Sequence, residues 1–322
     1  MEAALSLIGE DLINVEEQFR KDLASNVPLI RKVGEYVLSS GGKRIRPALL
    51  LLSAKLCGYQ GTRHVPLASV IEFIHTATLL HDDVVDSATL RRGNASANTV
   101  WGNEASVLVG DFLFSKSFSL MVEDGDLKVL KVLSGATTKI AEGEVLQLIC
   151  TSDLEMTEER YIEVVKGKTA ILISAASQAG AILGKASPEQ EAALADFGME
   201  LGIAFQIMDD LLDYTSSEEE FGKNIGHDLE EGKITLPLIH TLQNCTPAER
   251  DLIAEAVNSD VLDENDIRAV FDLVHTYDGI NYAAGRAASY VAQCKSRLAS
   301  FADSQVRKAL LDLADYVVSR NS

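Results

Sequence analysis

The sequence lacks most features of secreted, membrane-spanning or metal-finger proteins. Its 4 cysteines are scattered over 322 residues without a Cys-x-x-Cys pair, which argues against a disulfide framework or zinc site. No apolar run approaches the length of about 18 residues that a membrane span needs. The N-terminus carries acidic residues and no basic region typical of a signal peptide. We therefore expect a cytoplasmic protein with at most peripheral membrane contact.

Positive charge is also scarce. The chain has 29 lysines and arginines against 48 aspartates and glutamates, which gives a net charge of −19. A field of this sign repels DNA and RNA, so we exclude nucleic acid as a partner. Small phosphate-bearing molecules remain compatible with the composition wherever a few cations are concentrated locally.

Helix breakers are few, because only 6 prolines occur and apolar residues, 47% of the chain, recur at helical spacing. We predict one all-α domain over residues 1–322, a large helical bundle with a central substrate cavity. Capping boxes with proline at the first helical position begin at Ser187 and Thr246. The predicted helices cover residues 28–40, 47–58, 66–86, 103–122, 126–150, 157–183, 188–214, 235–243, 247–258, 263–275, 278–300 and 302–320.

Two acidic segments of the form DDxxD, residues 82–86 and 209–213, stand out. In a helix their first and last aspartates share one face, while the middle aspartate lies about 100° around the axis. A single DDxxD is usually a solvated acidic face. Here both segments interrupt apolar runs, where repelling carboxylates are costly unless they bind a cation. Ligands made only of carboxylates favour Mg²⁺, which leaves positions for water and phosphate.

Basic residues gather in glycine-rich turns near these segments. Taken singly, each turn could be an ordinary charged surface loop. In a chain this acidic, five of them beside two metal motifs indicate a diphosphate site. The turns are Gly41–Pro47 (GGKRIRP), Leu90–Gly93 (LRRG), Lys166–Thr169 (KGKT), Gly222–Lys223 and Gly232–Lys233. KGKT is not a P-loop, because Ile162 occupies the place of the required first glycine and no strand precedes it.

Together these segments resemble the trans-isoprenyl diphosphate synthase (polyprenyl synthetase) family. The matching stretches follow the family's order between residues 41 and 238: GGKRIRP, LLHDDVVDSATLRRG, GDFLF, KGKTA, FQIMDDLLDY and GKNIGHDLEEGKITLPL. The two residues between the acidic pairs of the first motif are typical of bacterial long-chain members. The resemblance implies a helical isoprenoid-synthase fold, a homodimer, and a polyprenyl diphosphate product, octaprenyl by expectation, for quinone side chains.

The resemblance also implies a role for each matching residue. Mg²⁺ on the allylic diphosphate would be held by Asp82, Asp83, Asp86, Asp209 and Asp213. The allylic diphosphate itself would be bound by Arg91, Lys168, Thr169, Gln206, Lys223 and Lys233. Isopentenyl diphosphate would be bound by Lys43, Arg46, His75 and Arg92. The central catalytic residues would be Asp82, Asp86, Asp209 and Lys168.

His75 also has an ordinary interpretation, since a lone histidine in an apolar helix is more often a packed core residue. It lies two helical turns before Asp82 on a similar face, which together with the family match favours ligand contact.

In the reaction that the resemblance implies, diphosphate leaves an allylic substrate such as farnesyl diphosphate. The double bond of isopentenyl diphosphate then attacks the allylic cation, and the departing diphosphate takes the released proton.

A growing apolar chain needs a dry tunnel along the helix over residues 66–86. Ala77 and Thr78 precede Asp82 by five and four residues, where a bulky aromatic blocks growth in short-chain relatives. We therefore expect a long product: octaprenyl, with hexa-, nona- and decaprenyl as alternatives. Met121 and Leu133 are candidates for the tunnel floor, and ordinary core packing explains them equally well.

Four other functions compete with this one. A geranylgeranyl or farnesyl diphosphate synthase would share the chemistry. A terpene cyclase usually carries one DDxxD and lacks the second set of cations. A non-catalytic subunit of a heteromeric synthase tends to lose the aspartate motifs, and both are intact here. A Mg²⁺-binding scaffold without chemistry leaves the arginine clusters unexplained.

Overall fold

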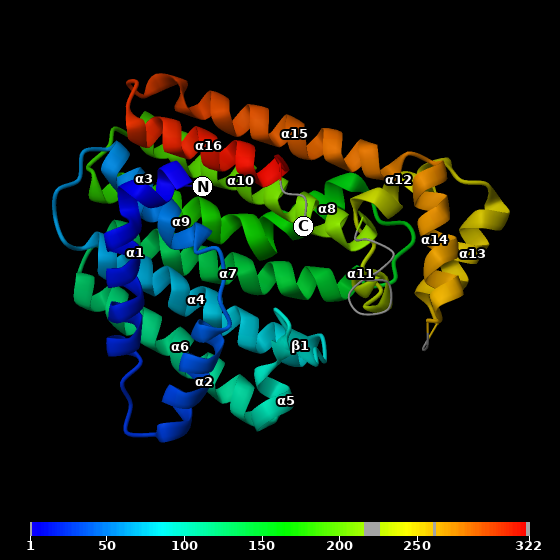
Figure 1. The fold of residues 1–322 in the computed structure, drawn as a ribbon, viewed down its shortest axis with the longest axis horizontal. Coiled ribbons are helices and arrows are strands. Elements are labelled where there is room, and N and C mark those ends of the chain that lie inside the picture. The colour runs from blue at the N-terminus through cyan, green and yellow to red at the C-terminus, as the bar shows by residue number, and fades with distance from the viewer. Residues whose placement is uncertain (1, 216–225, 260–261, 320–322) are drawn as a thin grey trace. The chain divides into compact units, whose positions relative to one another are not determined.

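The computed structural model describes residues 2–215, 226–259 and 262–319. Within these ranges the chain is mostly helix, with one two-stranded hairpin (Figure 1). The prediction of an all-α fold is confirmed. The four cysteines are free thiols in this structure.

The chain forms two compact units. Unit 1 consists of Met1–Thr137, Leu172–Gly198 and Leu298–Asp312, and unit 2 of Thr138–Ile171, Met199–Arg297 and Leu313–Ser322. The chain passes from one unit to the other within four helices, α7 (Leu127–Ile149), α9 (Ile171–Leu183), α10 (Pro188–Thr215) and α16 (Gln305–Ser319). The assignment of residues 1–322 to one domain stays a prediction.

Unit 1 is built around α4 (His64–Val85), which packs against α1, α3 and α6 (Figure 1). Its apolar residues form a core in which the rings of Phe19 and Phe73 stack with centroids 4.2 Å apart. The other helices of this unit are α1 (Glu2–Asp22), α2 (Pro28–Ser39), α3 (Ile45–Leu56), α5 (Ala97–Trp101), α6 (Asn103–Asp124) and α9 (Ile171–Leu183).

A short hairpin follows α4. Strands β1 (Leu90–Arg91) and β2 (Asn94–Ala95) pair antiparallel. Both residues of the turn, Arg92 and Gly93, have positive φ, 54° and 77°, as a type I′ turn requires. The Tyr36 hydroxyl of α2 donates a hydrogen bond of 2.7 Å to the Ala95 carbonyl, which ties the hairpin to the helical core.

Unit 2 packs its helices around a second apolar core. Helix α12 contacts α8, α14 and α15, and α14 contacts α13 and α15. A π-helical turn, η1, continues α8, and a 3₁₀ turn, η3 (Leu298–Ser300), follows α15. The elements of unit 2 are α8 (Glu158–Val165), η1 (Lys166–Ala170), α11 (His227–Glu230), α12 (Leu236–Asn244), α13 (Pro247–Val257), α14 (Glu264–Thr276) and α15 (Gly279–Arg297).

Each predicted helix has a counterpart, with ends that differ by a few residues. Both predicted capping boxes form: Thr246 and Glu249 exchange their two hydrogen bonds, as do Ser187 and Gln190. Helices α1, α5 and α11 and the hairpin were not predicted from the sequence. Helix α1 was detectable, because Ile8, Val15 and Phe19 lie on one helical face and are buried.

Helix α6 is the one helix of the described chain that is long and apolar enough to cross a membrane. Asp111 and Lys116 interrupt its apolar residues, which is why no long apolar run appears in the sequence. This is weak evidence for a membrane span, because core helices of soluble proteins have the same length and composition.

Helix α7 and the π turn approach each other within unit 2 so closely that their backbones touch. A Cβ atom on Gly143 would lie 2.5 Å from the Lys168 nitrogen, and one on Gly167 would lie 2.9 Å from the Gly143 Cα. Only glycine at both positions permits this contact. By contrast, a Cβ on Gly135, also in α7, would meet nothing within 4 Å.

We therefore expect opposite effects from the same substitution at two places in α7. Gly135→Ala should raise the free energy of unfolding by about 0.5–1 kcal/mol, because alanine favours helix. Gly143→Ala should lower it by about 1–3 kcal/mol, because the methyl group meets backbone. Urea denaturation measures both, and equal effects would contradict the close contact.

Candidate active site

The first acidic motif lies at the C-terminal end of α4. The helix ends at Val85, and Asp86 is its C-cap residue, with its N–H donating 2.8 Å to the Asp82 carbonyl. The carboxylates of Asp82 and Asp86 therefore sit four residues apart at the negative end of the helix dipole. Both their mutual repulsion and the dipole disfavour this arrangement, and a bound cation relieves both.

The middle aspartate of this motif is in a different situation. Asp83 is only 3% exposed, and its Oδ1 accepts a hydrogen bond of 2.8 Å from Arg91 Nε and a second from Arg91 Nη2. Burial raises the pKa of Asp83, and Arg91 opposes that shift. The structure thus joins a predicted Mg²⁺ ligand to a predicted diphosphate ligand. Their separate roles stay predictions.

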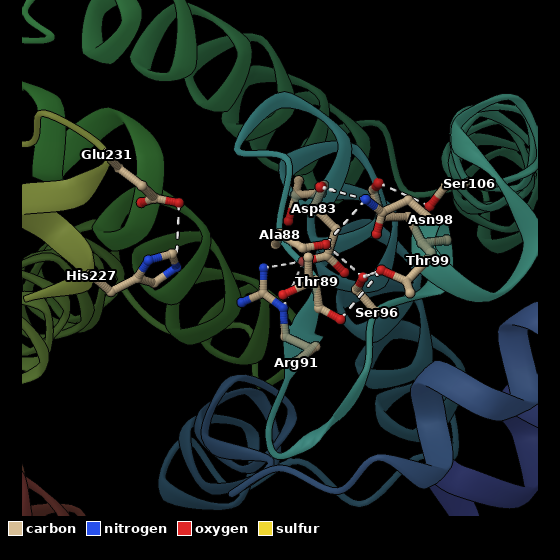
Figure 2. Close-up of polar contacts among 12 residues, drawn as sticks. Asp83, Ala88, Thr89, Arg91, Ser96, Asn98, Thr99, Ser106, His227 and Glu231 are labelled. Carbon is tan, nitrogen blue, oxygen red and sulfur yellow. Dashed lines mark hydrogen bonds and ion pairs between the residues drawn. The ribbon is translucent and has the colours of Figure 1, made fainter. Parts of the chain in front are cut away.

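Polar side chains fix the segment that follows the motif (Figure 2). The Asn98 amide donates to the Asp83 carbonyl at 3.0 Å and to the Ala88 carbonyl at 3.1 Å. The Ser96 hydroxyl donates to the same Ala88 carbonyl at 2.6 Å. These bonds satisfy carbonyls left over at the helix end and hold the loop that leads to Arg91.

Arginines surround two polar residues of α4, the buried Glu72 and the partly buried His75. Arg44 donates to Glu72 at 2.9 Å, and Arg46 donates to Nε2 of His75 at 3.2 Å. A guanidinium has no acceptor, so His75 accepts this bond as a neutral ring. Burial first, and then the arginines including Arg92, lower the pKa of His75 well below its ordinary value. His75 therefore stays neutral amid positive charge.

Arg92 completes this cluster from the hairpin turn. Its guanidinium donates to the Gly41 carbonyl, and a Cβ on Gly42 would lie 2.7 Å from its Nη1. Burial and then the neighbouring Arg44 and Arg91 lower the pKa of Arg92. Such crowding of cations favours an incoming anion. The predicted isopentenyl diphosphate set all belongs to unit 1, on α3, α4, the turn before α3 and the hairpin: Lys43, Arg46, His75 and Arg92.

In unit 2, four predicted ligands of the allylic diphosphate line one cavity of about 100 Å³: Lys168, Thr169, Gln206 and Lys233. Lys168 donates to Glu144 at 2.9 Å from the π turn, an irregularity that often marks functional sites. Of the other two predicted ligands, Arg91 belongs to unit 1 and Lys223 lies outside the described residues.

The middle aspartate of the second motif is also buried and hydrogen-bonded. The Tyr161 hydroxyl donates to Oδ2 of Asp210 at 2.5 Å, and Gln206 Nε2 donates to its Oδ1 at 2.7 Å. Burial raises the pKa of Asp210 to about 6, against the effect of these two bonds. Gln206 in turn accepts a bond of 2.7 Å from the Thr169 hydroxyl.

The last aspartate, Asp213, holds the start of α11. Its carboxylate accepts the backbone N–H groups of His227 at 3.2 Å and Asp228 at 3.0 Å. The pKa of Asp228 is raised well above its ordinary value by burial and then by Asp210 and Asp213, while Lys233 opposes the shift. Unit 2 thus concentrates carboxylates whose mutual repulsion a divalent cation would reduce.

The donor set of both motifs fits Mg²⁺, since it consists only of carboxylate oxygens. Among the described residues, no three acidic, histidine or cysteine side chains are gathered around one point as ligands of a single ion. Mg²⁺ commonly takes one or two carboxylates and completes its shell with water and substrate phosphate, so this arrangement is compatible with it. Asp82, Asp86, Asp209 and Asp213 stay predicted ligands.

The predicted chain-length residues are mostly inside unit 1. Ala77 is buried among Phe73, Leu80 and their neighbours, and Met121 and Leu133 are 1% and 0% exposed. Thr78 is partly exposed and donates its hydroxyl to the His75 carbonyl at 2.8 Å. Burial of this kind agrees with both a tunnel wall and ordinary core packing.

Sequence reasoning missed three residues that support the site. Glu72 and Tyr161 gave no local signal, because their partners Arg44 and Asp210 lie 28 and 49 residues away along the chain. Asp228 stands inside the family stretch GHDLEEGK, so the motif match contained the information to select it.

The neutral state of His75 predicts an acid-sensitive contribution to stability. Its folded pKa lies below the ordinary value of about 6.5, so at lower pH the unfolded chain binds a proton that the folded chain does not. The contribution is present above that pH and is lost below it, by up to about 1.4 kcal/mol per pH unit. His75→Gln, which accepts a bond from Arg46 without titrating, should lose less unfolding free energy between about pH 7 and pH 5.

Urea denaturation at both pH values measures this difference. His275→Gln, at an exposed position near the end of α14, is the control and should keep the acid sensitivity of the wild type. Equal losses in the wild type and in His75→Gln would show that the ring is not held neutral by Arg44, Arg46, Arg91 and Arg92.

Similarity to known proteins identifies the family of this chain. The sequence pattern described as Polyprenyl synthetase matches residues 27–274. Octaprenyl diphosphate synthase of Escherichia coli (strain K12) is 44% identical over 321 residues, which are 100% of this chain and 99% of that protein.

Two solved structures are similar over nearly their whole length. Decaprenyl diphosphate synthase from Rhodobacter capsulatus has a TM-score of 0.94 and 43% identity, covering 98% of each chain. Polyprenyl synthase from Caulobacter crescentus CB15, complexed with calcium and isoprenyl diphosphate, has a TM-score of 0.95 and 41% identity, covering 100% of this chain and 98% of that one. The chain therefore belongs to the polyprenyl synthetase family of trans-prenyl diphosphate synthases.

Proposed function

We propose that this protein is a long-chain prenyltransferase. It would add isopentenyl diphosphate units to farnesyl diphosphate and produce octaprenyl diphosphate for quinone side chains. The observation that carries the proposal is that unit 1 contains two oppositely charged groups of side chains. A crowded arginine cluster around neutral His75 shares that unit with two carboxylates at the negative end of α4. An anion-binding group and a cation-binding group are what a metal-assisted diphosphate reaction needs.

Each group has a stated role in the proposed reaction. Lys43, Arg46 and Arg92 would bind isopentenyl diphosphate. Arg91 and the lysines and polar residues of the unit 2 cavity would bind the allylic diphosphate: Lys168, Thr169, Gln206 and Lys233. Mg²⁺ held by Asp82, Asp83, Asp86, Asp209 and Asp213 would supply positive charge for the leaving diphosphate.

The chemistry needs no protein nucleophile. The allylic C–O bond breaks and diphosphate leaves with the electron pair. The double bond of isopentenyl diphosphate then attacks the allylic carbon, and loss of a proton to the departing diphosphate restores a double bond. The protein's cations, Lys168 and Arg91 among them, would lower the cost of separating charge.

Product length is a separate part of the proposal. Octaprenyl agrees with the similarity to the Escherichia coli enzyme, and decaprenyl would agree with that to the Rhodobacter protein. The absence of a bulky side chain at Ala77 and Thr78 supports a long product over a geranylgeranyl or farnesyl product.

We also propose a cytoplasmic homodimer. Exposed apolar side chains on α6, including Leu108 at 66% and Val122 at 65%, and Leu127 at 79% at the start of α7, are suited to a subunit interface. A brief membrane contact would accompany release of the apolar product.

The first test is to incubate the pure protein with farnesyl diphosphate, labelled isopentenyl diphosphate and Mg²⁺, and to size the products. Asp82→Ala and Asp209→Ala should each reduce turnover by at least about a thousandfold, since the metal charge is lost, with an unchanged helical circular dichroism spectrum. Asp251→Ala, at an exposed position on α13, should keep wild-type turnover. Near-normal activity of either motif variant would exclude the metal role.

A substitution at Arg92 should weaken substrate binding without lowering the stability of the fold. Arg92→Asn removes a guanidinium and should raise the KM for isopentenyl diphosphate about tenfold or more. Asparagine tolerates the left-handed conformation that Arg92 adopts, so the melting temperature should stay the same or rise. An unchanged KM would reject the assignment of Arg92 to this substrate.

The tunnel floor is tested by enlarging it. Met121→Ala and Leu133→Ala each remove a buried side chain and should shift the product distribution to longer chains by one or more isoprene units. Ala136→Gly, a buried neighbour of Leu133 along α7, is the control for general loosening of the core. An unchanged distribution in both variants would assign the two residues to core packing.

A further inference from the structure

Four side chains in unit 2 form a continuous chain of hydrogen bonds. Tyr161 of α8 donates to Asp210 of α10 at 2.5 Å. Gln206, one turn earlier in α10, donates to the other oxygen of Asp210 at 2.7 Å. The Thr169 hydroxyl of the π turn donates to Gln206 Oε1 at 2.7 Å. The first and last residues of this hydrogen-bond series, Tyr161 and Thr169, lie on the continuous helical segment formed by α8 and η1. The two middle residues, Asp210 and Gln206, lie on α10.

The polarity of these bonds fixes their direction. A tyrosine hydroxyl in contact with a carboxylate is the donor, and a carboxylate accepts at both oxygens. With both oxygens of Asp210 in use, the Gln206 amide group must present its nitrogen to Asp210, which leaves its oxygen for Thr169. The orientation of one side chain thus sets that of the next.

Among the four hydrogen-bonded side chains, Tyr161 is the one that is neither a proposed ligand of diphosphate nor part of an aspartate motif. Gln206 and Thr169 are proposed diphosphate ligands, and Asp210 stands between two proposed metal ligands. Tyr161 is 4% exposed and lines the inner wall of the cavity that these residues share. A buried hydroxyl is costly unless it has a partner, so its contact with Asp210 is specific.

We propose that Tyr161 is a positioning residue for the diphosphate site of unit 2. Its hydroxyl holds the Asp210 carboxylate, which orients Gln206 and, through it, the Thr169 side chain and the π turn that carries Lys168. This inference rests on the proposed function, because it assigns Tyr161 to the allylic diphosphate. Tyr161 itself touches neither substrate nor metal in this role.

The π turn explains why such positioning is needed. A π turn has one more residue between hydrogen-bond partners than an α-helix and is rare, so we expect tertiary contacts to support it. On one side, the turn is supported by the Gly143–Gly167 backbone contact. From α10, Gly202 packs closely against Ala170 at the end of the turn, and the Gln206–Thr169 bond, which depends on Asp210 and Tyr161, is the polar contact on the cavity side.

The test is Tyr161→Phe, which removes one hydroxyl and keeps the ring. Binding of inorganic pyrophosphate in the presence of Mg²⁺, measured by calorimetry, should weaken about tenfold, and the KM for farnesyl diphosphate should rise by a similar factor. The KM for isopentenyl diphosphate should not change, because its proposed ligands belong to unit 1.

Tyr282→Phe is the matched control. The Tyr282 hydroxyl also donates to a carboxylate of α8, that of Glu158, at the opposite end of this helix from the π turn. Both variants lose one tyrosine–carboxylate bond, and because the Tyr161–Asp210 pair is the more buried of the two, Tyr161→Phe should lower the melting temperature at least as much as Tyr282→Phe. Tyr282→Phe should bind pyrophosphate like the wild type. A tenfold loss in this control as well would mean that general destabilisation of α8 causes the effect, which would overturn the proposal.

A double-mutant cycle tests the route of the effect. If Tyr161 acts through Thr169, then Tyr161→Phe should cost about twofold or less in pyrophosphate affinity when Thr169→Val is already present. Two independent losses that multiply would overturn the proposed route. Should Tyr161→Phe not fold, Gln206→Met breaks the next link, and wild-type pyrophosphate affinity in that variant would overturn the proposal.

Failure of the inference is distinguishable from failure of the proposed function. If the wild type forms no polyprenyl diphosphate, the proposed function is wrong. If the wild type is active and Tyr161→Phe binds pyrophosphate as the wild type does, the function stands and the positioning role is wrong.

Discussion

The burial of carboxylates is the constraint on which the rest of the site depends. A carboxylate removed from water must find donors, or the fold loses several kcal/mol. Asp83 finds them in Arg91, Asp210 in Tyr161 and Gln206, and Asp213 in the first N–H groups of α11. Each of these partners lies close in sequence to a proposed phosphate ligand. Arg91 shares the hairpin with Arg92, the helix of Tyr161 continues into the π turn with Lys168, and α11 is followed by the turn with Lys233. The acidic motifs thus organise the cations around them.

The two units gather side chains of opposite charge around their buried polar groups. In unit 1, guanidinium groups crowd around Glu72 and His75, and this lowers the pKa values of His75 and Arg92. In unit 2, buried carboxylates raise one another's pKa values, and Lys233 only partly opposes the effect on Asp228. Like charges that the fold holds close together repel one another. A ligand of the opposite charge relieves this repulsion, and no further free energy is needed to bring the charges together, because folding has already placed them.

The sequence predicted what local spacing determines. Helices followed from the apolar period, and the start of α13 from the capping box at Thr246. The position of Asp83 about 100° around the helix from Asp82 was predicted, but its burial against Arg91 was not. The sequence did not predict the hairpin, because two-residue strands leave almost no periodic signal. Nor did it predict Glu72 or Tyr161, since each is defined by a partner far along the chain. The family motifs selected most ligands, yet positioning residues outside the motifs became visible only through contacts.

A net charge of −19 makes this reliance on local contacts necessary. The long-range field of the protein repels a diphosphate, but salt screens such a field beyond about 8–10 Å. Attraction must therefore come from cations within hydrogen-bonding distance, where a small displacement weakens a charge-assisted bond steeply. A long lysine side chain on a flexible loop would hold such a position poorly. Lys168 instead stands on a π turn braced by the backbone contact at Gly143 and by the Thr169–Gln206 bond. For an acidic protein, rigid backbone placement of a few cations replaces an overall positive field.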